Sequence, residues 1–170
     1  GKMYTQSYSE GIPQTEVKEI GTTDKTGTTI TFTPDKTIFE TLEYKFDVLA
    51  TRCRELSFLN KGLKLFLIDE RTMVDGEFKK AEFLSEGGLK EFVLFMDEGK
   101  TKIITEPIHV MGKEDNVEVE VALIYNNSYS ESIKSFVNNI NTREGGTHVS
   151  GFRRAVTREF DKYGKDNGMF

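Results

Sequence analysis

The sequence predicts an α+β fold, and two kinds of pattern support this prediction. Valine and glutamate alternate between Val117 and Val121, which is typical of a strand with one apolar face. Elsewhere, near residues 44–60 and again after Thr147, apolar residues recur at steps of three and four, as they do on helices. Strand and helix patterns do not alternate regularly along the chain, so α+β is favoured over a doubly wound sheet.

The first half of the chain contains four expected strands and one helix. Residues 1–10 alternate like a strand, and residues 28–33 alternate apolar side chains with β-branched threonines until a Pro-Asp pair ends the run. A helix is expected near residues 44–60, where apolar residues form one face. Residues 63–69 and 78–84 are expected to form a strand pair around the turn sequence DGEF.

The second half begins at Ser85-Glu86-Gly87-Gly88, which reads as a helix cap and a junction between domains. The expected elements that follow are a helix at 89–96, strands at 106–112, 116–126 and 132–137, and a helix that starts at Thr147. We therefore expect two domains, at residues 1–84 and 85–170.

Composition limits the classes of protein to consider. The chain has 170 residues, a net charge of −5 and a single cysteine, Cys53, so it has no internal disulfide framework. No apolar run approaches the roughly 18 residues that a membrane-spanning helix needs. These features predict a soluble, cytoplasmic protein. The mild overall charge gives no sign of nucleic-acid binding, but residues 143–165 hold six basic and three acidic side chains.

The motif Thr26-Gly27-Thr28 has two interpretations. It can be a turn whose threonines begin a strand, which is the commoner case for a three-residue motif. Alternatively, Gly27 allows the backbone to pass close to a flat ligand, Thr28 offers a hydroxyl that donates and accepts, and Ile30 packs against the ligand's ring. The second interpretation describes one wall of a purine pocket.

The segment INTREGGTHVSGFRR also has two interpretations. Gly145-Gly146 before a helix start presents free backbone N–H groups that can hold an anion, although a tight turn with a helix cap is commoner. His148 has no ligand partners at metal-binding spacing, so packing or capping is favoured for it. Arg153, at the edge of the apolar stripe, could point into a cavity and attract phosphate. The stripe of Arg154, Arg158 and Lys162 is more simply a solvated helix face. No complete catalytic or metal-binding set is present.

Three segments taken together resemble a known family. They are TGTTITFTPD near the start, RELSFLNKGLKLFLIDER at residues 54–71, and VEVALIYNNSYSESIKSFVNNINTREGGTHVSGFRRAVTREF, which ends at Phe160. Their order and spacing resemble the gyrase B family, which supplies the ATPase of bacterial DNA gyrase, over nearly the whole chain. The paralogous protein of topoisomerase IV has a similar series, and the complete RELSFLN favours gyrase.

The resemblance implies a domain assignment and specific site residues. Residues 1–84 would be the C-terminal part of a GHKL ATPase domain, and residues 85–170 the first part of a transducer domain with a ribosomal-protein-like α/β fold. Gly27, Thr28 and Ile30 would form the adenine-side wall, with the Thr28 hydroxyl bonding partly through water. Arg153 would face the cavity that transported DNA enters. The stretch Gly145–His148 would be structural rather than catalytic.

The resemblance also implies an activity, cofactors and partners. The parent protein would be an ATP-dependent type II DNA topoisomerase that uses ATP and Mg²⁺ to drive DNA strand passage and supercoiling. Its partners would be DNA, the gyrase A protein in an A2B2 complex, and a second copy through the ATPase region. The family's catalytic glutamate and Mg²⁺-binding asparagine would lie upstream, and its γ-phosphate lysine downstream, so the chain alone is expected to be inactive.

Three alternatives stay open at this point. They are the ATPase protein of topoisomerase IV, which decatenates DNA, a GHKL relative such as a mismatch-repair ATPase, and a non-enzymatic nucleotide-binding module. The sequences GGTH and NNINTREGG argue against the mismatch-repair ATPase. The chain is also expected to expose unpaired sheet edges or apolar faces, which invite dimerisation.

Overall fold

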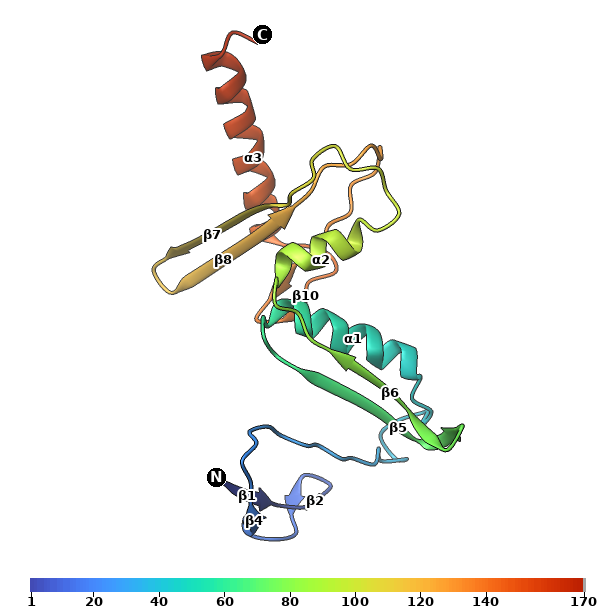
Figure 1. Cartoon of the computed structure of the whole chain (residues 1–170). Coiled ribbons are helices and arrows are strands. Elements are labelled where there is room, and N and C mark those ends of the chain that lie inside the picture. The colour runs from blue at the N-terminus through green and yellow to red at the C-terminus, as the bar shows by residue number, and fades with distance from the viewer. Residues whose placement is uncertain (170) are drawn as a thin grey trace. The chain divides into compact units, whose positions relative to one another are not determined.

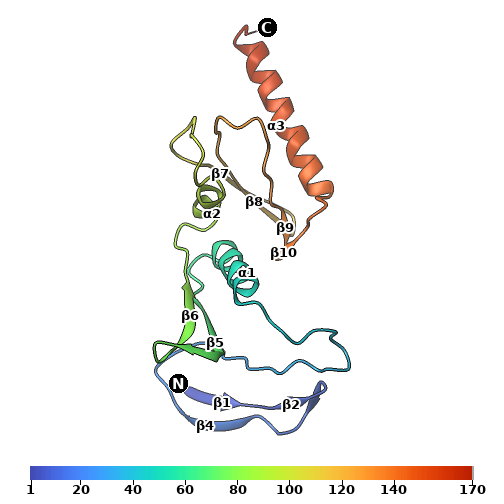
Figure 2. The same ribbon diagram turned by 90° about the vertical axis from the view of Figure 1, so that its right-hand side faces the viewer.

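A computed structural model describes residues 1–169, with the side chains of Thr72 and Val74 left out (Figures 1 and 2). It contains helices and antiparallel strands, so the predicted mixture of α and β structure is confirmed. Contacts divide the chain into two compact units, with the border between Lys45 and Phe46. The border expected between residues 84 and 85 concerns family domains rather than contacts, and it stays a prediction.

The first unit is built from two small antiparallel strand pairs. Strand β1 (Lys2–Thr5) pairs with β4 (Lys18–Thr22), and the register shifts once along this pair. Between them, β2 (Tyr8–Ser9) pairs with β3 (Ile12–Pro13). The strand expected over residues 1–10 is therefore present as two shorter strands that the structure separates.

The strand expected at residues 28–33 is absent, because the structure assigns no strand between β4 and the first helix. No described segment offers these residues a backbone partner, and side-chain alternation cannot replace ladder hydrogen bonds. The stop after this run is present as expected. Asp35 Oδ1 accepts hydrogen bonds from the Thr37 backbone N–H and from the Thr37 hydroxyl, both at 2.7 Å, which fixes a local turn.

The second unit opens with a helix that covers a hairpin. Helix α1 (Phe46–Leu59) packs on β5 (Leu65–Val74) and β6 (Glu77–Phe83), which form an antiparallel pair (Figure 1). The hairpin turns through Asp75 and Gly76, whose φ angles of 53° and 81° are left-handed. Such a pair of residues is typical of a tight hairpin turn, so the DGEF prediction is confirmed.

A second helix and hairpin follow. Helix α2 (Leu89–Met96) packs on β7 (Ile108–Glu114) and β8 (Val117–Leu123), which are antiparallel with Gly112 opposite Val119. Two short strands come next, β9 (Phe136–Val137) paired with β10 (Ile140–Asn141), and then helix α3 (Thr147–Asp166). The strand expected at 132–137 therefore shrinks to two residues, because only β10 is available to pair with it and β10 is equally short.

The apolar core of the second unit lies where α1 meets α2. Phe83 and Phe92 are its buried hydrophobic residues among those described. The Phe58 ring stacks on the Phe92 ring with centroids 4.9 Å apart, and Phe92 lies 6.1 Å from the Phe136 ring of β9. Helices α1 and α2 and strand β9 are thus joined by three rings.

Many apolar side chains remain outside this core. Within residues 1–169 every sheet has two strands, so each strand pair has open edges. Val110 and Val119, on one face of the β7–β8 hairpin, are each more than half exposed. The described helices include none that is long and apolar enough to cross a membrane.

Candidate functional site

The Thr26-Gly27-Thr28 motif lies in an open stretch of the first unit. A Cβ placed on Gly27 would meet no atom within 4 Å, so the backbone is freely approachable there. No described residue hydrogen-bonds the exposed Thr28 hydroxyl, which leaves both its donor and its acceptor available. These are the properties that a ligand-facing glycine and threonine need.

Ile30 offers an apolar surface on the same segment, because its side chain is 80% exposed. Two residues on, the Phe32 ring meets the Tyr44 ring edge-on, with centroids 5.6 Å apart and planes at 83°. This contact ties the end of the segment to residues just before α1. The structure thus places Gly27, Thr28 and Ile30 on one open segment, and it leaves their predicted role in adenine binding untested.

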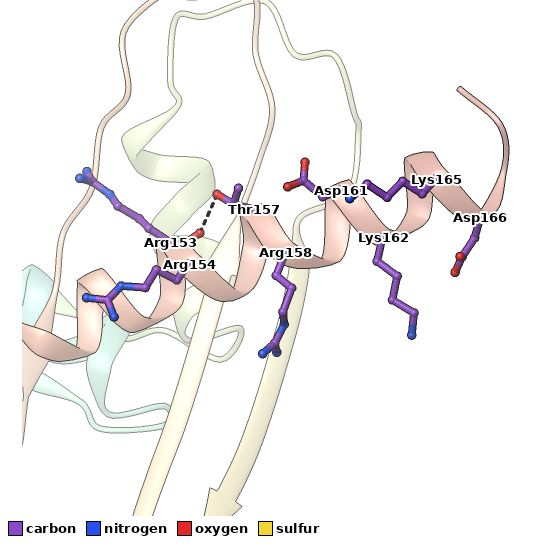
Figure 3. Close-up of a pocket in the computed structure, with 8 residues that line it drawn as sticks. All are labelled: Arg153, Arg154, Thr157, Arg158, Asp161, Lys162, Lys165 and Asp166. Carbon is purple, nitrogen blue, oxygen red and sulfur yellow. Dashed lines mark hydrogen bonds between the residues drawn. The ribbon is translucent and has the colours of Figure 1, made fainter. Parts of the chain in front are cut away.

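Arg153 lies in the first half of α3 and is paired with an acid. Its Nη2 donates to Glu131 Oε1, in the loop between β8 and β9, and both side chains are more than half exposed. The Thr157 hydroxyl donates to the Arg153 carbonyl oxygen over 3.0 Å, one turn along the helix (Figure 3). Arg153 is therefore held at the surface, and its predicted role at a DNA cavity stays a prediction.

A shallow depression of about 600 Å³ runs along the exposed face of α3. Figure 3 shows Arg154, Arg158 and Lys162 projecting to one side of the helix, with Arg153 directed elsewhere. No described residue forms an ion pair with Arg154 or Lys162. The face therefore carries uncompensated positive charge in a chain whose net charge is −5.

The start of α3 is organised by its neighbours rather than by a side-chain cap. Gly146 is the N-cap, with no side-chain hydrogen bond to the helix end. His148 Nε2 lies 3.2 Å from the Thr142 hydroxyl, and a Cβ on Gly146 would stand 3.0 Å from the His148 ring. A Cβ on Gly146 would thus crowd the His148 ring, and His148 itself is exposed and bonded to Thr142, so its packing or capping role stays a prediction. The expected cap at Thr147 is replaced by Gly146.

Among residues 1–169, no three His, Cys, Asp or Glu side chains gather closely enough to hold a metal ion.

Sequence reasoning missed a cluster of charged and amide side chains on α1. Glu55, whose side chain is 13% exposed, pairs with Arg52 at 3.3 Å and with Lys134 from the segment before β9. Burial by itself raises the pKa of the Glu55 carboxyl, but hydrogen bonds and charge attraction from Lys134 and Arg52 outweigh it and hold the pKa below its ordinary value. Lys134 lies 79 residues from Glu55, too far along the sequence for spacing to reveal this pair.

Comparison with known proteins identifies the family. Residues 88–170 match the family model for DNA gyrase B. The DNA gyrase B protein of Eisenibacter elegans is 55% identical over 170 residues, a match that covers 99% of this chain and 36% of that protein. The chain belongs to the DNA gyrase B family. The corresponding protein of Cytophaga hutchinsonii is 51% identical over the same shares of the two chains.

A solved structure of a gyrase B protein has the same fold as this DNA gyrase B family member. It is the 43K ATPase domain of Thermus thermophilus gyrase B in complex with an aminocoumarin, with a TM-score of 0.80 and 32% identity. The match covers 100% of this chain and 46% of that one. The family and fold predicted from the three sequence segments are therefore confirmed. The chain spans little more than a third of the length of its Eisenibacter and Cytophaga relatives.

Proposed function

We propose that the chain is part of an ATP-dependent type II DNA topoisomerase of the gyrase type. The parent protein would couple ATP binding and hydrolysis to DNA strand passage and supercoiling. One observation carries the proposal. The chain is 55% identical to the DNA gyrase B protein of Eisenibacter elegans, and this match covers 99% of the chain rather than one motif. No observation favours topoisomerase IV, a mismatch-repair ATPase or a non-enzymatic module over this function.

Within this function the two parts of the chain have different roles. Residues 1–84 would supply the end of the ATPase domain, and residues 85–170 the beginning of the transducer. The gyrase B family model begins its match at residue 88, close to this border, which supports the division. The chain would then connect the nucleotide pocket to the transducer, the part of the protein that faces the transported DNA.

Gly27, Thr28 and Ile30 would form the adenine-side wall of the ATP pocket. The free Thr28 hydroxyl would hydrogen-bond the base directly or through water, and the exposed Ile30 side chain would pack on its ring. The Mg²⁺ that accompanies ATP would be bound by the family's asparagine, which the resemblance places outside these residues. The chain alone is therefore expected to hydrolyse no ATP.

The proposed partners are DNA, the gyrase A protein in an A2B2 complex, and a second copy of the gyrase B protein itself. Arg153 would face the transported DNA, and its exposed guanidinium supports a contact with phosphate. Open sheet edges and exposed apolar side chains in the described residues support association with further protein. A DNA substrate, together with the single cysteine, supports a cytoplasmic location.

The test uses the full-length protein mixed with the gyrase A protein and relaxed plasmid. ATP-dependent negative supercoiling is expected, and decatenation without supercoiling would instead indicate topoisomerase IV. Thr28→Val is expected to raise the KM for ATP about three- to tenfold, the loss of one hydrogen bond, with little change in kcat. Thr31→Val, at another exposed threonine of the same segment, is the matched control. Absence of any ATP-dependent DNA activity would overturn the proposal.

A further inference from the structure

Helix α1 holds the segment around β9 through a set of polar side chains, named here the Glu55 cluster. Its members are Arg52, Glu55, Asn60, Lys134 and Asn139. Lys134 Nζ pairs with Glu55 Oε1 although 79 residues separate the two positions. Arg52 bridges the same two segments, since its Nη1 lies 3.3 Å from Glu55 Oε2 and its Nη2 donates to the Asn139 carbonyl oxygen over 2.7 Å.

The cluster lies against the aromatic core rather than in open solvent. Lys134 Nζ stands 5.7 Å from the centre of the Phe92 ring, which is itself stacked on Phe58 of α1. The Glu55 side chain is 13% exposed and that of Lys134 is 37% exposed. Charges that are partly withdrawn from water attract each other more strongly than exposed pairs do, so this pair fixes geometry better than a surface ion pair.

A second link strengthens the first. The Asn139 side-chain amide donates to Asn60 Oδ1 over 2.9 Å, at the end of α1. Close by, the junction before α2 is also tied to α1's end, because the Gly62 backbone N–H donates to the Ser85 carbonyl oxygen over 2.8 Å. The end of α1 is thus bonded both to the residues that begin the second half of the chain and to the β9–β10 turn.

We propose that the Glu55 cluster is the rigid joint through which the ATPase part and the transducer part of the parent protein affect each other. Lys134 and Arg52 would act as positioning residues in this joint. The inference rests on the proposed function, because α1 belongs to the expected ATPase part and residues 134–139 to the expected transducer part. Coupling between two sites requires an element whose position both sites influence. A segment bonded at Glu55, Arg52 and Asn60 moves with α1, whereas an unbonded segment would not follow it.

The experiment measures coupling separately from chemistry. Full-length protein is assayed for ATP hydrolysis with and without linear duplex DNA, and the ratio of the two rates is the readout. Lys134→Met keeps the length of the side chain and removes the charge. It is expected to change the ratio about two- to thirtyfold, the range found for residues that modulate coupling without touching a ligand. Its basal kcat and KM for ATP are expected to stay within about twofold of wild type, since Lys134 touches no nucleotide in this proposal.

Three further variants control for charge and for folding. Lys134→Arg keeps the pair with Glu55 and is expected to keep the ratio. Lys79 makes the same kinds of contact elsewhere on α1, since it pairs with Asp47 at 3.3 Å and stands 4.2 Å from the Phe46 ring. It joins α1 to β6 and not to residues 134–139, so Lys79→Met is expected to leave the ratio unchanged. Glu55→Gln, which preserves shape, should reproduce Lys134→Met and replaces it if that variant fails to fold.

The possible results separate the inference from the proposed function. An unchanged ratio in Lys134→Met and Glu55→Gln, with normal ATP hydrolysis, overturns the inference and leaves the proposed function standing. An equal change in Lys79→Met also overturns it, because the loss of any lysine that pairs with an acid of α1 would then suffice. Wild-type protein that hydrolyses no ATP overturns the proposed function and the inference together.

Discussion

The side-chain amide of Asn139 donates a hydrogen bond to Oδ1 of Asn60 over 2.9 Å, joining the β9–β10 turn to the end of α1. Asn139 also has a left-handed backbone, with a φ of 66°, and the preceding Asn138 has a φ of 48°. Asparagine adopts this conformation more readily than most residues do, whereas glycine adopts it without strain. Asn139 therefore serves both the turn and the link to α1.

Substitutions at Asn139 should separate these two contributions. Asn139→Ala loses the hydrogen bond and adds backbone strain, so we expect it to weaken the turn by about 2–3 kcal/mol. Asn139→Gly loses only the hydrogen bond and should cost about 1 kcal/mol. Hydrogen exchange of the amides of residues 136–141 in the full-length protein measures the local opening. Equal exchange in the two variants would show that the left-handed backbone contributes nothing.

A pH dependence follows from Glu55. Its folded-state pKa lies below its ordinary value of 4.5, because Lys134 and Arg52 stabilise the carboxylate more than burial opposes it. A depressed pKa gives stability that is fully present above pH 4.5 and is lost as the pH falls through the folded-state pKa. We therefore expect exchange of residues 136–141 to rise as the solution is acidified below about pH 4.5.

The matched variant for this prediction is Glu55→Gln, which cannot titrate and should flatten the response. Asp69 provides an internal reference, since hydrogen bonds from Arg71 lower its pKa to about 2. The contribution of Asp69 should thus persist until the solution approaches pH 2. A response that is the same in wild type and Glu55→Gln would show that another group is responsible.

Local patterns in the sequence were sufficient to predict the helices and the two long hairpins. Apolar spacing placed the first helix within two residues of α1 at its start, and the Asp75-Gly76 turn placed the hairpin of β5 and β6. The run at residues 28–33 shows the limit of such patterns. Its alternation is a property of the side chains, whereas a strand needs backbone partners, and no described segment supplies them.

The candidate sites differ in whether the sequence alone could predict them. Local residue patterns singled out Thr28 and Arg153, and the resemblance to a family supplied their expected roles. The Glu55 cluster was not predicted, because Glu55 and Lys134 meet only after folding. A pairing across 79 residues leaves no periodic pattern in the sequence. The same holds for Glu131, whose pairing with Arg153 depends on how the loop before β9 returns to α3.

The junction before α2 should be sensitive to the loss of one hydroxyl. Ser85 is 1% exposed, and its Oγ accepts from the Gly88 N–H over 2.9 Å and donates to Glu91 Oε2 over 2.5 Å. The Gly87 N–H donates to the other Glu91 oxygen over 2.9 Å, so serine and glutamate together fix the turn before α2, whose N-cap Gly88 has no side-chain cap hydrogen bond. Ser85→Ala leaves the buried Gly88 N–H without this acceptor, and we expect it to destabilise the junction by about 1–2 kcal/mol.

Hydrogen exchange of the α2 amides measures this effect, with the exposed Ser150→Ala as the control for replacing a serine on a helix. Gly87→Ala provides an independent test. A Cβ there would stand 2.6 Å from Glu91 Cγ, so it should displace the glutamate and raise exchange as Ser85→Ala does. Normal exchange in both variants would mean that packing alone holds the junction.

Glu131 should moderate the contact between Arg153 and DNA in the proposed function. The carboxylate occupies the guanidinium that a phosphate would bind, and this pair must open first. Since exposed pairs are worth at most about 1 kcal/mol, we expect Glu131→Gln to tighten binding of duplex DNA about two- to fivefold. Arg153→Gln should weaken binding and lower the salt dependence by about one phosphate contact. Fluorescence anisotropy of the full-length protein over a salt series measures both.

Glu118→Gln is the control for overall charge, because it frees Lys113 on the β7–β8 hairpin and makes the same change in net charge. An equal gain in Glu118→Gln would show that overall charge, rather than release of Arg153, strengthens binding.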